Sequence, residues 1–367
     1  MADESRIQHH TIANMALATE PNANGLSIAQ LLSTHPREQL FVHPLMWTAR
    51  HLELLRCGFV DGGIIKTPGT SPPPADRAPA DDCDDCDDDG DDGGDNHDEA
   101  AKLQRYLAYL NGEVLAAQRL AACRGTISKQ NALLRLVPGL KHRRDGIQFL
   151  FGRRAVADLP CSSFSYTPQS PSQPTPPAHL VYLDLSDMER CRRSKLLGAP
   201  PPPGIPRRRN LPLTRRSEKQ LRRIRPGKRY EDPYIAALLI ALAQDQRHCE
   251  KGSDDYDDDD DNDGNPSGAA NAAPLQMLLA NGYDADWLYI YTTKVSTELL
   301  DMLNRPSYPL PANAQPGPGM VIYRQRLAFT PYNTLSQRLS SFLQHASSLG
   351  EHSCCMEGGV VGQVDIT

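Results

Sequence analysis

The sequence predicts an α/β protein: a helix-rich core with a small mixed sheet covered by helices in three layers, interrupted by disordered acidic and Pro-rich insertions. Three observations lead to this prediction. An apolar segment followed by a helix start occurs three times after residue 178, the segment EDPYIAALLIALAQ is apolar on nearly every side, and charge is concentrated in a few long runs. Strands that alternate with helices are typical of a sheet covered by helices.

The three strand–helix units define much of the predicted core. Their apolar segments are Leu180–Leu185, Trp287–Thr292 and Val321–Phe329, and each is followed by a side chain that can cap a helix. The first is followed by Ser186-Asp187-Met188-Glu189, a capping box in spacing and residue type. The helix starts expected in the other two units are Ser296, Thr330 as N-cap and Pro331 at the first helical position.

The segment EDPYIAALLIALAQ predicts the most buried helix. Asp232 can cap it, and Pro233 suits its first turn, where a missing N–H costs nothing. The apolar side chains of this helix lie on nearly every side of it, so we expect other elements to cover it on several sides. Other elements expected are helices over Pro44–Arg56 and Ala100–Arg124 and a buried strand at Ile147–Phe151. The helix from Ala100 would carry its apolar face on Leu103, Leu107, Leu110, Val114 and Leu120.

These elements and the runs between them divide the chain. We expect the core to be made of an N-terminal helical segment over 1–66, a helix and strand over 100–160, a strand and helix over 179–198, the buried helix over 230–249 and strand–helix units over 273–346. Between them we expect a disordered acidic insertion over 67–99, a Pro/Ser linker over 161–178, a basic Pro/Arg-rich segment over 199–229 and a second disordered acidic insertion over 250–272. A disordered tail over 347–367 would follow. Long tracts of one charge sign bury too little apolar surface to fold.

The net charge of −6 hides a strong separation of charge along the chain. Asp81–Glu99 holds 12 acidic residues, Glu250–Asp263 holds 9, and Arg190–Arg229 holds 15 basic residues with one acidic residue among them. Charge therefore belongs mainly to the segments between core elements. We expect the acidic runs to compete for the basic stretch and so to weaken its non-specific binding of RNA or DNA.

Composition also bears on where the protein works. The first ten residues are polar, unlike a signal peptide, and the longest near-apolar run, Tyr234–Ala243, is too short to span a membrane. The nine cysteines are irregularly spaced, which favours free thiols in a reducing compartment. We therefore expect an intracellular protein without membrane association, in the nucleus or the cytoplasm, with the nucleus favoured.

Several familiar catalytic motifs are missing from the sequence. The one Gly-Lys pair, Gly227-Lys228, lies outside any predicted strand-to-helix turn, so it does not form a phosphate-binding P-loop. No lysine has Asp or Glu two positions before it, the arrangement by which one large class of nucleases holds a metal ion. Gly-x-Ser-x-Gly and His-Glu-x-x-His are also missing. We predict no catalytic residue, no metal ligand and no cofactor.

Three short motifs suggest chemistry but have simpler interpretations. Cys83 and Cys86 have the spacing of half a zinc site, yet they lie in an acidic run without a second pair of ligands. His248 and Cys249 are sequence neighbours, whereas a thiol nucleophile and its base must be spatial neighbours. Leu275–Leu279 matches a leucine docking motif, but a core helix is the preferred interpretation.

The basic stretch contains the candidate binding or nuclear-targeting residues. A cationic segment attracts phosphates and acidic receptor grooves, but this stretch lacks aromatic side chains on which bases could stack. A solvated linker without a partner is the first interpretation of the stretch, and nuclear import and direct nucleic-acid contact are the functional alternatives. The candidate residues are Arg207, Arg208, Arg209, Arg215, Arg216, Arg222 and Arg223.

Three stretches, Tyr230–Gln244, Trp287–Pro306 and Phe329–Leu339, carry a family resemblance. Their sequences YEDPYIAALLIALAQ, WLYIYTTKVSTELLDMLNRP and FTPYNTLSQRL resemble a recurring signature of uncharacterised proteins from filamentous fungi. That family has no known activity. The resemblance therefore implies one folded core with tolerated insertions, and it assigns no function and no site residue.

These observations together favour a non-catalytic protein-interaction protein whose charged segments make the contacts. Its partner would be another protein, or an import receptor bound through the basic stretch 190–229. The alternatives are a nucleic-acid-associated nuclear protein that uses the same stretch, and an enzyme whose site is assembled from positions that no motif marks. An apolar pocket with converging polar groups would favour the enzyme.

Overall fold

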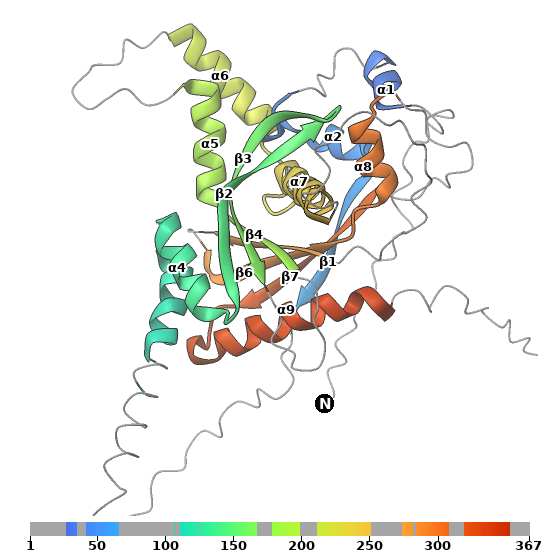
Figure 1. The fold of residues 1–367 in the computed structure, drawn as a ribbon. Helices are drawn as coiled ribbons and strands as arrows, with labels where there is room; N and C mark the ends of the chain where they lie inside the picture. The colour runs from blue at the N-terminus through green and yellow to red at the C-terminus, as the bar shows by residue number, and fades with distance from the viewer. Residues whose placement is uncertain are drawn as a thin grey trace, which may run out of the picture.

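The fold, a twisted sheet with helices on both faces, is shown in Figure 1 as a computed structural model of the chain. The structure describes residues 27–34, 42–65, 107, 111–123, 125–166, 178–198, 211–250, 274–281, 284–307 and 319–352. The predicted insertions over 67–99 and 250–272 lie outside these ranges, except for Glu250 at the end of a helix.

Helices and strands alternate along most of the described chain. The N-terminal part contributes α1 (Ile28–Thr34), the short 3₁₀ helix η2 (Pro44–Met46), α2 (Ala49–Leu54) and β1 (Cys57–Ile64). A helix over 111–122 and α4 (Thr126–Leu136) precede β2 (Leu140–Phe151), β3 (Arg154–Tyr166) and β4 (Ala178–Asp184). Then follow α5 (Leu185–Leu197), α6 (Leu211–Ile224), α7 (Pro233–Glu250), β5 (Leu275–Asn281), β6 (Asp284–Thr293), α8 (Thr297–Asn304), β7 (Met320–Ala328), η3 (Tyr332–Thr334) and α9 (Leu335–His352).

The described strands form one seven-stranded mixed sheet in the order β1-β7-β6-β5-β4-β3-β2. β1 pairs in parallel with β7, and β4 pairs in parallel with β5, whereas the other neighbours are antiparallel. β1 reaches its place from far away in the sequence, because Val60 pairs with Tyr323. The predicted α/β class with a mixed sheet is confirmed.

Side chains that alternate along the strands divide the core into two layers. In β4, Val181 and Leu183 belong to the cluster around α7, whereas Leu180 and Tyr182 belong to the cluster on the opposite face. The first cluster also contains residues of α2, α5 and α8. The second contains residues of the helix over 111–122, α4 and α9. Helices therefore cover both faces of the sheet, as predicted.

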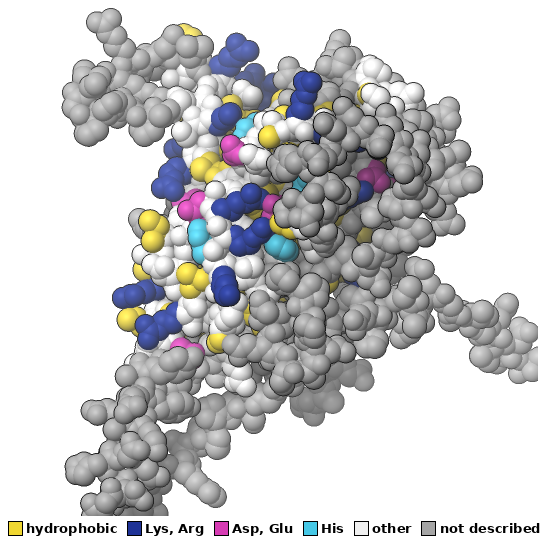
Figure 2. Space-filling view, viewed as in Figure 1, with side chains coloured by type: hydrophobic (Ala, Val, Ile, Leu, Met, Phe, Trp, Pro, Cys, Tyr) yellow, Lys and Arg dark blue, Asp and Glu magenta, His cyan; other side chains and the backbone are white. Residues whose placement is uncertain are grey.

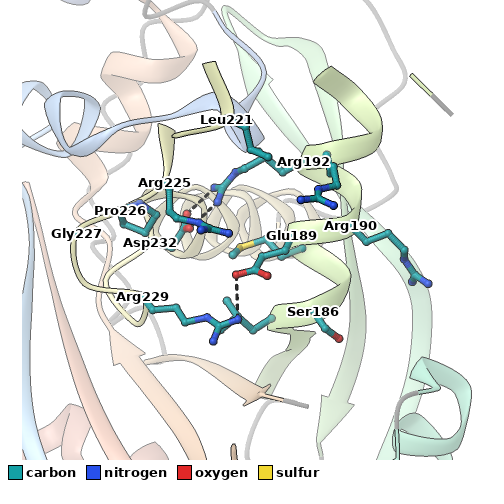
Figure 3. A pocket seen from close by; sticks show the side chains of 13 residues that line it. Ser186, Glu189, Arg190, Arg192, Leu221, Arg225, Pro226, Gly227, Arg229 and Asp232 are labelled. Atoms are coloured by element: carbon teal, nitrogen blue, oxygen red, sulfur yellow. Dashed lines mark hydrogen bonds and ion pairs between the residues drawn. The ribbon is translucent and has the colours of Figure 1, made fainter. Parts of the chain in front are cut away.

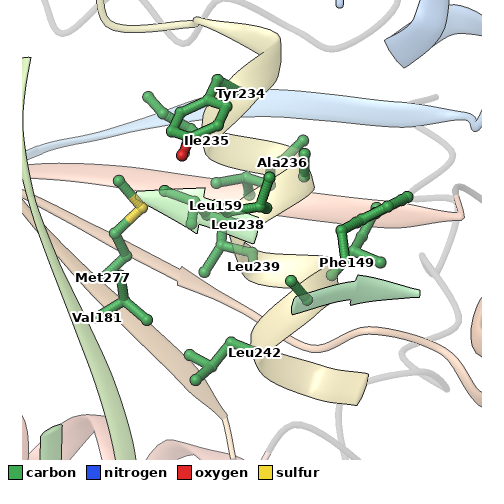
Figure 4. Packing of buried hydrophobic residues seen from close by; sticks show 14 of the residues in the cluster. Phe149, Leu159, Val181, Tyr234, Ile235, Ala236, Leu238, Leu239, Leu242 and Met277 are labelled. Carbon is green, nitrogen blue, oxygen red and sulfur yellow. The ribbon is translucent and has the colours of Figure 1, made fainter. Parts of the chain in front are cut away.

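Helix α7 lies across one face of the sheet and is surrounded by other elements (Figure 1). Every residue from Tyr234 to Leu242 is fully buried, and Figure 4 shows these side chains among residues of β2, β3, β4 and β5. Asp232 accepts a hydrogen bond of 2.9 Å from the N–H of Tyr234, and Pro233 begins the helix, as predicted. Burial of each of these leucines stabilises the folded state by about 1.5–3 kcal/mol.

Neither α7 nor any other described helix has the length and hydrophobicity needed to cross a bilayer.

The N-terminal segment 1–66 is not helical throughout, contrary to the prediction. The helix predicted over Pro44–Arg56 is divided into η2 and α2, because Trp47 and Thr48 between them have extended backbones. Cys57–Ile64 forms the edge strand β1, which the sequence analysis missed. Its sequence, CGFVDGGI, contains three glycines and so lacks the alternating apolar pattern of a strand.

Three further predictions about elements are wrong. β3 continues to Tyr166 and β4 begins at Ala178, so the predicted linker over 161–178 is partly strand. Leu275–Leu279, predicted as a core helix, lies in β5, where every residue is buried. A short, uniformly apolar run fits a buried strand as well as a helix. Helix α9 continues to His352, past the predicted boundary at 346.

Two of the predicted helix starts also differ. Asp184, and not Ser186, is the N-cap of α5, and it accepts a hydrogen bond of 2.8 Å from the N–H of Ser186. Pro331 lies before η3 with an extended backbone, so neither Thr330 nor Pro331 begins α9. Ser296 caps α8 as predicted, and its hydroxyl accepts a hydrogen bond of 3.2 Å from the N–H of Leu299.

The helix predicted over Ala100–Arg124 is confirmed where it is described, but its buried face is different. Leu120 is fully buried as expected, whereas Leu107 is 49% exposed. The buried positions beside Leu120 are the small residues Ala116, Ala117 and Ala121. The pattern of large apolar residues therefore gave the wrong face, because alanines make much of the contact with the rest of the protein.

Candidate functional site

Four of the seven predicted binding residues fall within the described chain. The exposed surface of α6 carries Arg215, Arg216, Arg222 and Arg223. The other three, Arg207–Arg209, lie outside the described residues. The predicted basic segment over 199–229 is therefore not an open linker throughout, because α6 occupies 211–224.

The spacing of the less exposed residues explains why α6 displays its arginines. The less exposed positions, which recur every three or four residues, are Thr214, Ser217, Leu221 and Ile224, and Ile224 is buried. This face packs against α5, where the hydroxyl of Ser217 donates a hydrogen bond of 3.0 Å to the backbone oxygen of Leu196. The arginines consequently point to solvent. In Figure 2, Lys and Arg side chains recur along the side of the molecule where α5 and α6 lie.

A pocket of about 720 Å³ lies between α5, the end of α6 and residues 225–232, which we call the pocket loop. Five arginines and two carboxylates line it, an excess of three positive charges. We call it the arginine pocket, and Figure 3 shows its side chains. The charged residues that define its chemistry are Glu189, Arg192, Arg193, Arg225, Arg229 and Asp232.

Arg192 and Asp232 form the buried base of the arginine pocket. The Nη1 and Nη2 atoms of Arg192 each donate a hydrogen bond of 2.8 Å to Asp232, and Nε donates one of 2.7 Å to the backbone oxygen of Leu45. The two side chains are 4% and 1% exposed. Because the guanidinium of Arg192 is neutralised and bonded on three nitrogens, it serves as framework and not as a free charge.

A second ion pair crosses the arginine pocket near its opening. Nη2 of Arg229 donates a hydrogen bond of 3.0 Å to Glu189, and both side chains are partly exposed. The adjacent Tyr230 stacks on Tyr289 with ring centroids 3.9 Å apart, and its backbone oxygen accepts a hydrogen bond of 2.9 Å from Tyr291. These contacts fix the pocket loop on the sheet and thereby position the arginines that it carries.

Two guanidinium groups of the arginine pocket have no counter-ion within the described part of the chain. Arg193 and Arg225 line the pocket and are exposed, and neither takes part in an ion pair there. Arg190, in contrast, is paired with Asp187 and points away from the pocket in Figure 3. The arginine pocket thus presents two uncompensated positive charges, an arrangement that attracts anions.

The grouping of these residues was not predicted. All five pocket arginines belong to the basic stretch 190–229, but the sequence does not show that α5 and the pocket loop meet. Asp232 was expected only as a helix cap, and it also neutralises Arg192. The one signal available was the position of Asp232 beside the most buried helix, since a buried carboxylate needs a positive or hydrogen-bonding partner.

A buried lysine–carboxylate contact lies elsewhere, between α4 and the end of β4. Lys129 donates a hydrogen bond to Asp184, which also accepts hydrogen bonds from the backbone N–H and the hydroxyl of Ser186. The side chains of the pair are 0% and 2% exposed. The sequence did not indicate this contact, because Lys129 and Asp184 lie far apart along the chain and are brought together only by folding. Because the pair is enclosed, we interpret it as a link between α4 and β4.

The described cysteines are free thiols that differ in burial. They are Cys57, Cys123, Cys161, Cys191 and Cys249. Burial raises the pKa of Cys57 and Cys161 to about 12, so both are protonated at neutral pH and are poor nucleophiles. Cys249 accepts a hydrogen bond of 3.4 Å from Arg143 on β2. Within the described ranges, no three His, Cys, Asp or Glu side chains are grouped to hold a metal ion, and Cys83 and Cys86 lie outside them.

Comparisons with protein-family models, with curated proteins and with solved structures find no match to this chain. The function is therefore inferred from the geometry and charge of the arginine pocket and of α6.

Proposed function

We propose that this chain is a non-catalytic interaction protein that binds an anionic segment of a partner protein. The binding surface is the cationic face formed by the arginine pocket and the exposed arginines of α6. One observation carries the proposal: Arg193 and Arg225 line a concave site without a counter-ion in the described chain. Charge of this kind gives a partner of opposite sign both faster association and specificity.

The groups in the arginine pocket favour binding over catalysis. A general acid or base needs a titratable group that is free to exchange a proton with substrate. Both carboxylates of the described pocket lining, Glu189 and Asp232, are engaged by arginines, and the described lining residues include no His, Cys or Lys. The hydroxyl of Ser186 donates a hydrogen bond to Asp184, which also accepts one from Lys129. The groups present therefore support recognition of charge.

A nucleic acid is the second candidate partner, favoured by the exposed arginines of α6. Phosphate backbones attract such a surface whatever their sequence. Proteins that bind single strands also stack bases on aromatic side chains, and the stretch 190–229 has none. The pocket loop does contain Tyr230, but that ring is already stacked on Tyr289. We therefore place an anionic protein segment first.

Fluorescence anisotropy tests the proposal with three labelled probes: a polyglutamate peptide, a single-stranded oligonucleotide and a double-stranded oligonucleotide. Each is titrated with the full chain at low and at physiological salt. We expect the peptide to bind, and we expect Arg222→Ser/Arg223→Ser to weaken its binding. The matched control is Arg119→Ser/Arg154→Ser, which removes two exposed arginines that lie on other elements. This control should leave peptide binding close to that of the unmodified chain.

The outcomes separate the candidates. No peptide binding even at low salt, or equal losses in the two double variants, would remove the proposal. Oligonucleotide binding that persists at physiological salt and is lost with Arg215→Ser/Arg216→Ser would favour the nucleic-acid candidate instead. Loss of peptide binding with the α6 variant alone would support the protein partner.

A further inference from the structure

We propose that the arginine pocket binds a phosphomonoester group, carried by a phosphorylated side chain of the partner protein. This inference rests on the proposed function and narrows it to a ligand class. It concerns the pocket itself and not the exposed surface of α6. Its basis is the charge that remains when the internal ion pairs of the pocket are subtracted.

The uncompensated charge matches a phosphate dianion. Arg192 is neutralised by Asp232, Arg229 is bonded to Glu189, and Arg190 is bonded to Asp187. Among the described residues Arg193 and Arg225 remain without a counter-ion, so the pocket offers two positive charges there on two planar guanidinium groups. A phosphorylated side chain carries about −1.5 to −2 charges and three acceptor oxygens, whereas a carboxylate carries one charge and two oxygens. Guanidinium groups bind phosphate through paired N–H donors.

Arg193 and Arg225, which have no counter-ion in the described chain, belong to segments that are fixed to the rest of the fold. Arg193 follows Arg192 on α5, and Arg192 is fixed by Asp232 and by the backbone of Leu45. Arg225 belongs to the pocket loop, which is tied to the sheet through Tyr230. Binding a ligand therefore requires ordering of two side chains and not of a whole loop, which reduces the entropic cost of binding.

Glu189 makes the pocket selective. In Figure 3 its carboxylate lies inside the pocket, bonded to Arg229, and the Arg225 side chain extends toward the same space. An incoming anion is repelled by Glu189 and has to compete with it for Arg229. A dianion competes better than a carboxylate, because its attraction to the surrounding guanidinium groups is larger. The volume of about 720 Å³ also leaves room for residues that flank the phosphorylated side chain.

The test uses three degenerate peptide libraries that differ only at the central position, which is phosphoserine, serine or glutamate. Binding to the full chain is measured by fluorescence anisotropy at physiological salt. We expect the phosphoserine library to bind about tenfold or more tightly than the glutamate library, because each hydrogen bond to a charged group contributes on the order of a tenfold change in affinity. Inorganic phosphate should displace the phosphoserine library.

Variants localise the effect. Arg193→Gln/Arg225→Gln should weaken phosphoserine binding about tenfold or more, and the matched control Arg119→Gln/Arg154→Gln should change it less than about twofold. Glu189→Gln should strengthen binding, since it removes the competing carboxylate. Both substituted pocket arginines are exposed, so the variants should fold, and their thermal unfolding curves verify this.

The failures of the two proposals are distinguishable. If the polyglutamate peptide binds through α6 but the phosphoserine and glutamate libraries bind equally, the proposed function stands and the phosphate site is wrong. Equal losses in the pocket variant and its matched control would also overturn the phosphate site. If neither polyglutamate nor phosphoserine peptides bind, both proposals fail. A 5′-phosphorylated oligonucleotide that outcompetes the phosphoserine library would overturn the assignment to a protein.

Discussion

Arg192 and Asp232 join the middle of α5 to the residue before α7 through two hydrogen bonds of 2.8 Å in a nearly solvent-free position. Asp232 has a second role there, because it also accepts a hydrogen bond of 2.9 Å from the N–H of Tyr234. One carboxylate thus caps the central helix, neutralises a buried arginine and forms the base of the arginine pocket. Stability and the proposed binding site share this residue.

Asp232→Asn should destabilise the protein by about 3–5 kcal/mol, because it leaves the charge of Arg192 buried without a counter-ion. The asparagine keeps the size of the side chain and one oxygen for capping, but its NH2 group replaces the other oxygen, so the charge and one hydrogen bond from Arg192 are lost. Unfolding in guanidinium chloride, followed by circular dichroism, measures the free energy of unfolding. Lys228→Gln is the control, since Lys228 pairs with Glu231 at the surface and should matter little. Similar effects of the two substitutions would contradict the role given to Asp232.

Asp232 also illustrates what the sequence could predict. The cap, the proline at the first turn and the continuous apolar run all lie within 13 residues of one another, so local rules sufficed for α7. The strand–helix units β6–α8 and β7–α9 were predicted for the same reason, although the exact start of α9 was not.

Elements that depend on distant partners were predicted poorly. β1 contains three glycines, and it is stabilised as a strand by pairing with β7, more than 250 residues further along the chain. Leu275–Leu279 has no alternation, because β5 lies inside the sheet with helices on both faces. In both cases the missing information was tertiary: the strand pairing for β1, and burial on both faces for β5.

The candidate site shows the same limit. Its arginines lie within the basic stretch that the sequence singled out, but α6 was interpreted as part of a solvated segment because prolines and arginines surround it. Which arginines are neutralised depends on Glu189 and Asp232, which reach them from α5 and from the start of α7. Charge composition predicted the region, and only the fold separates paired from unpaired arginines.

Lys129→Met should also destabilise the protein by about 3–5 kcal/mol, because it leaves Asp184 buried without its lysine. Hydrogen bonds from Ser186 remain, so we expect the lower part of this range. Urea unfolding of the variant checks the value. Lys195→Met, at an exposed position on α5, is the control and should be close to neutral. If Lys129→Met were neutral too, the pair would not link α4 to β4 as we infer.

The raised pKa values predict which thiols react. With a pKa of about 12, Cys57 and Cys161 are thiolates in about one molecule in ten thousand at pH 8, whereas an ordinary cysteine is about one-quarter ionised. The pKa is raised, so a higher pH is needed to make these thiols reactive. Iodoacetamide should therefore modify the exposed Cys249 before Cys57 and Cys161, as peptide mapping by mass spectrometry would show. In urea all three should react at similar rates. Equal rates in the folded protein would show that Cys57 and Cys161 are not protected.

The acidic runs should weaken binding at the basic surface. Replacing every aspartate in Asp81–Asp95 and Asp254–Asp263 by asparagine removes 10 and 8 negative charges and keeps the length of the chain. We expect tighter binding of a double-stranded oligonucleotide and of the polyglutamate peptide, because both compete with these runs for the same arginines. The gain should be largest at low salt, since the screening length is only about 8 Å at physiological ionic strength. Anisotropy titrations at two salt concentrations measure it. Unchanged affinity at low salt would mean that the acidic runs and the basic surface act independently.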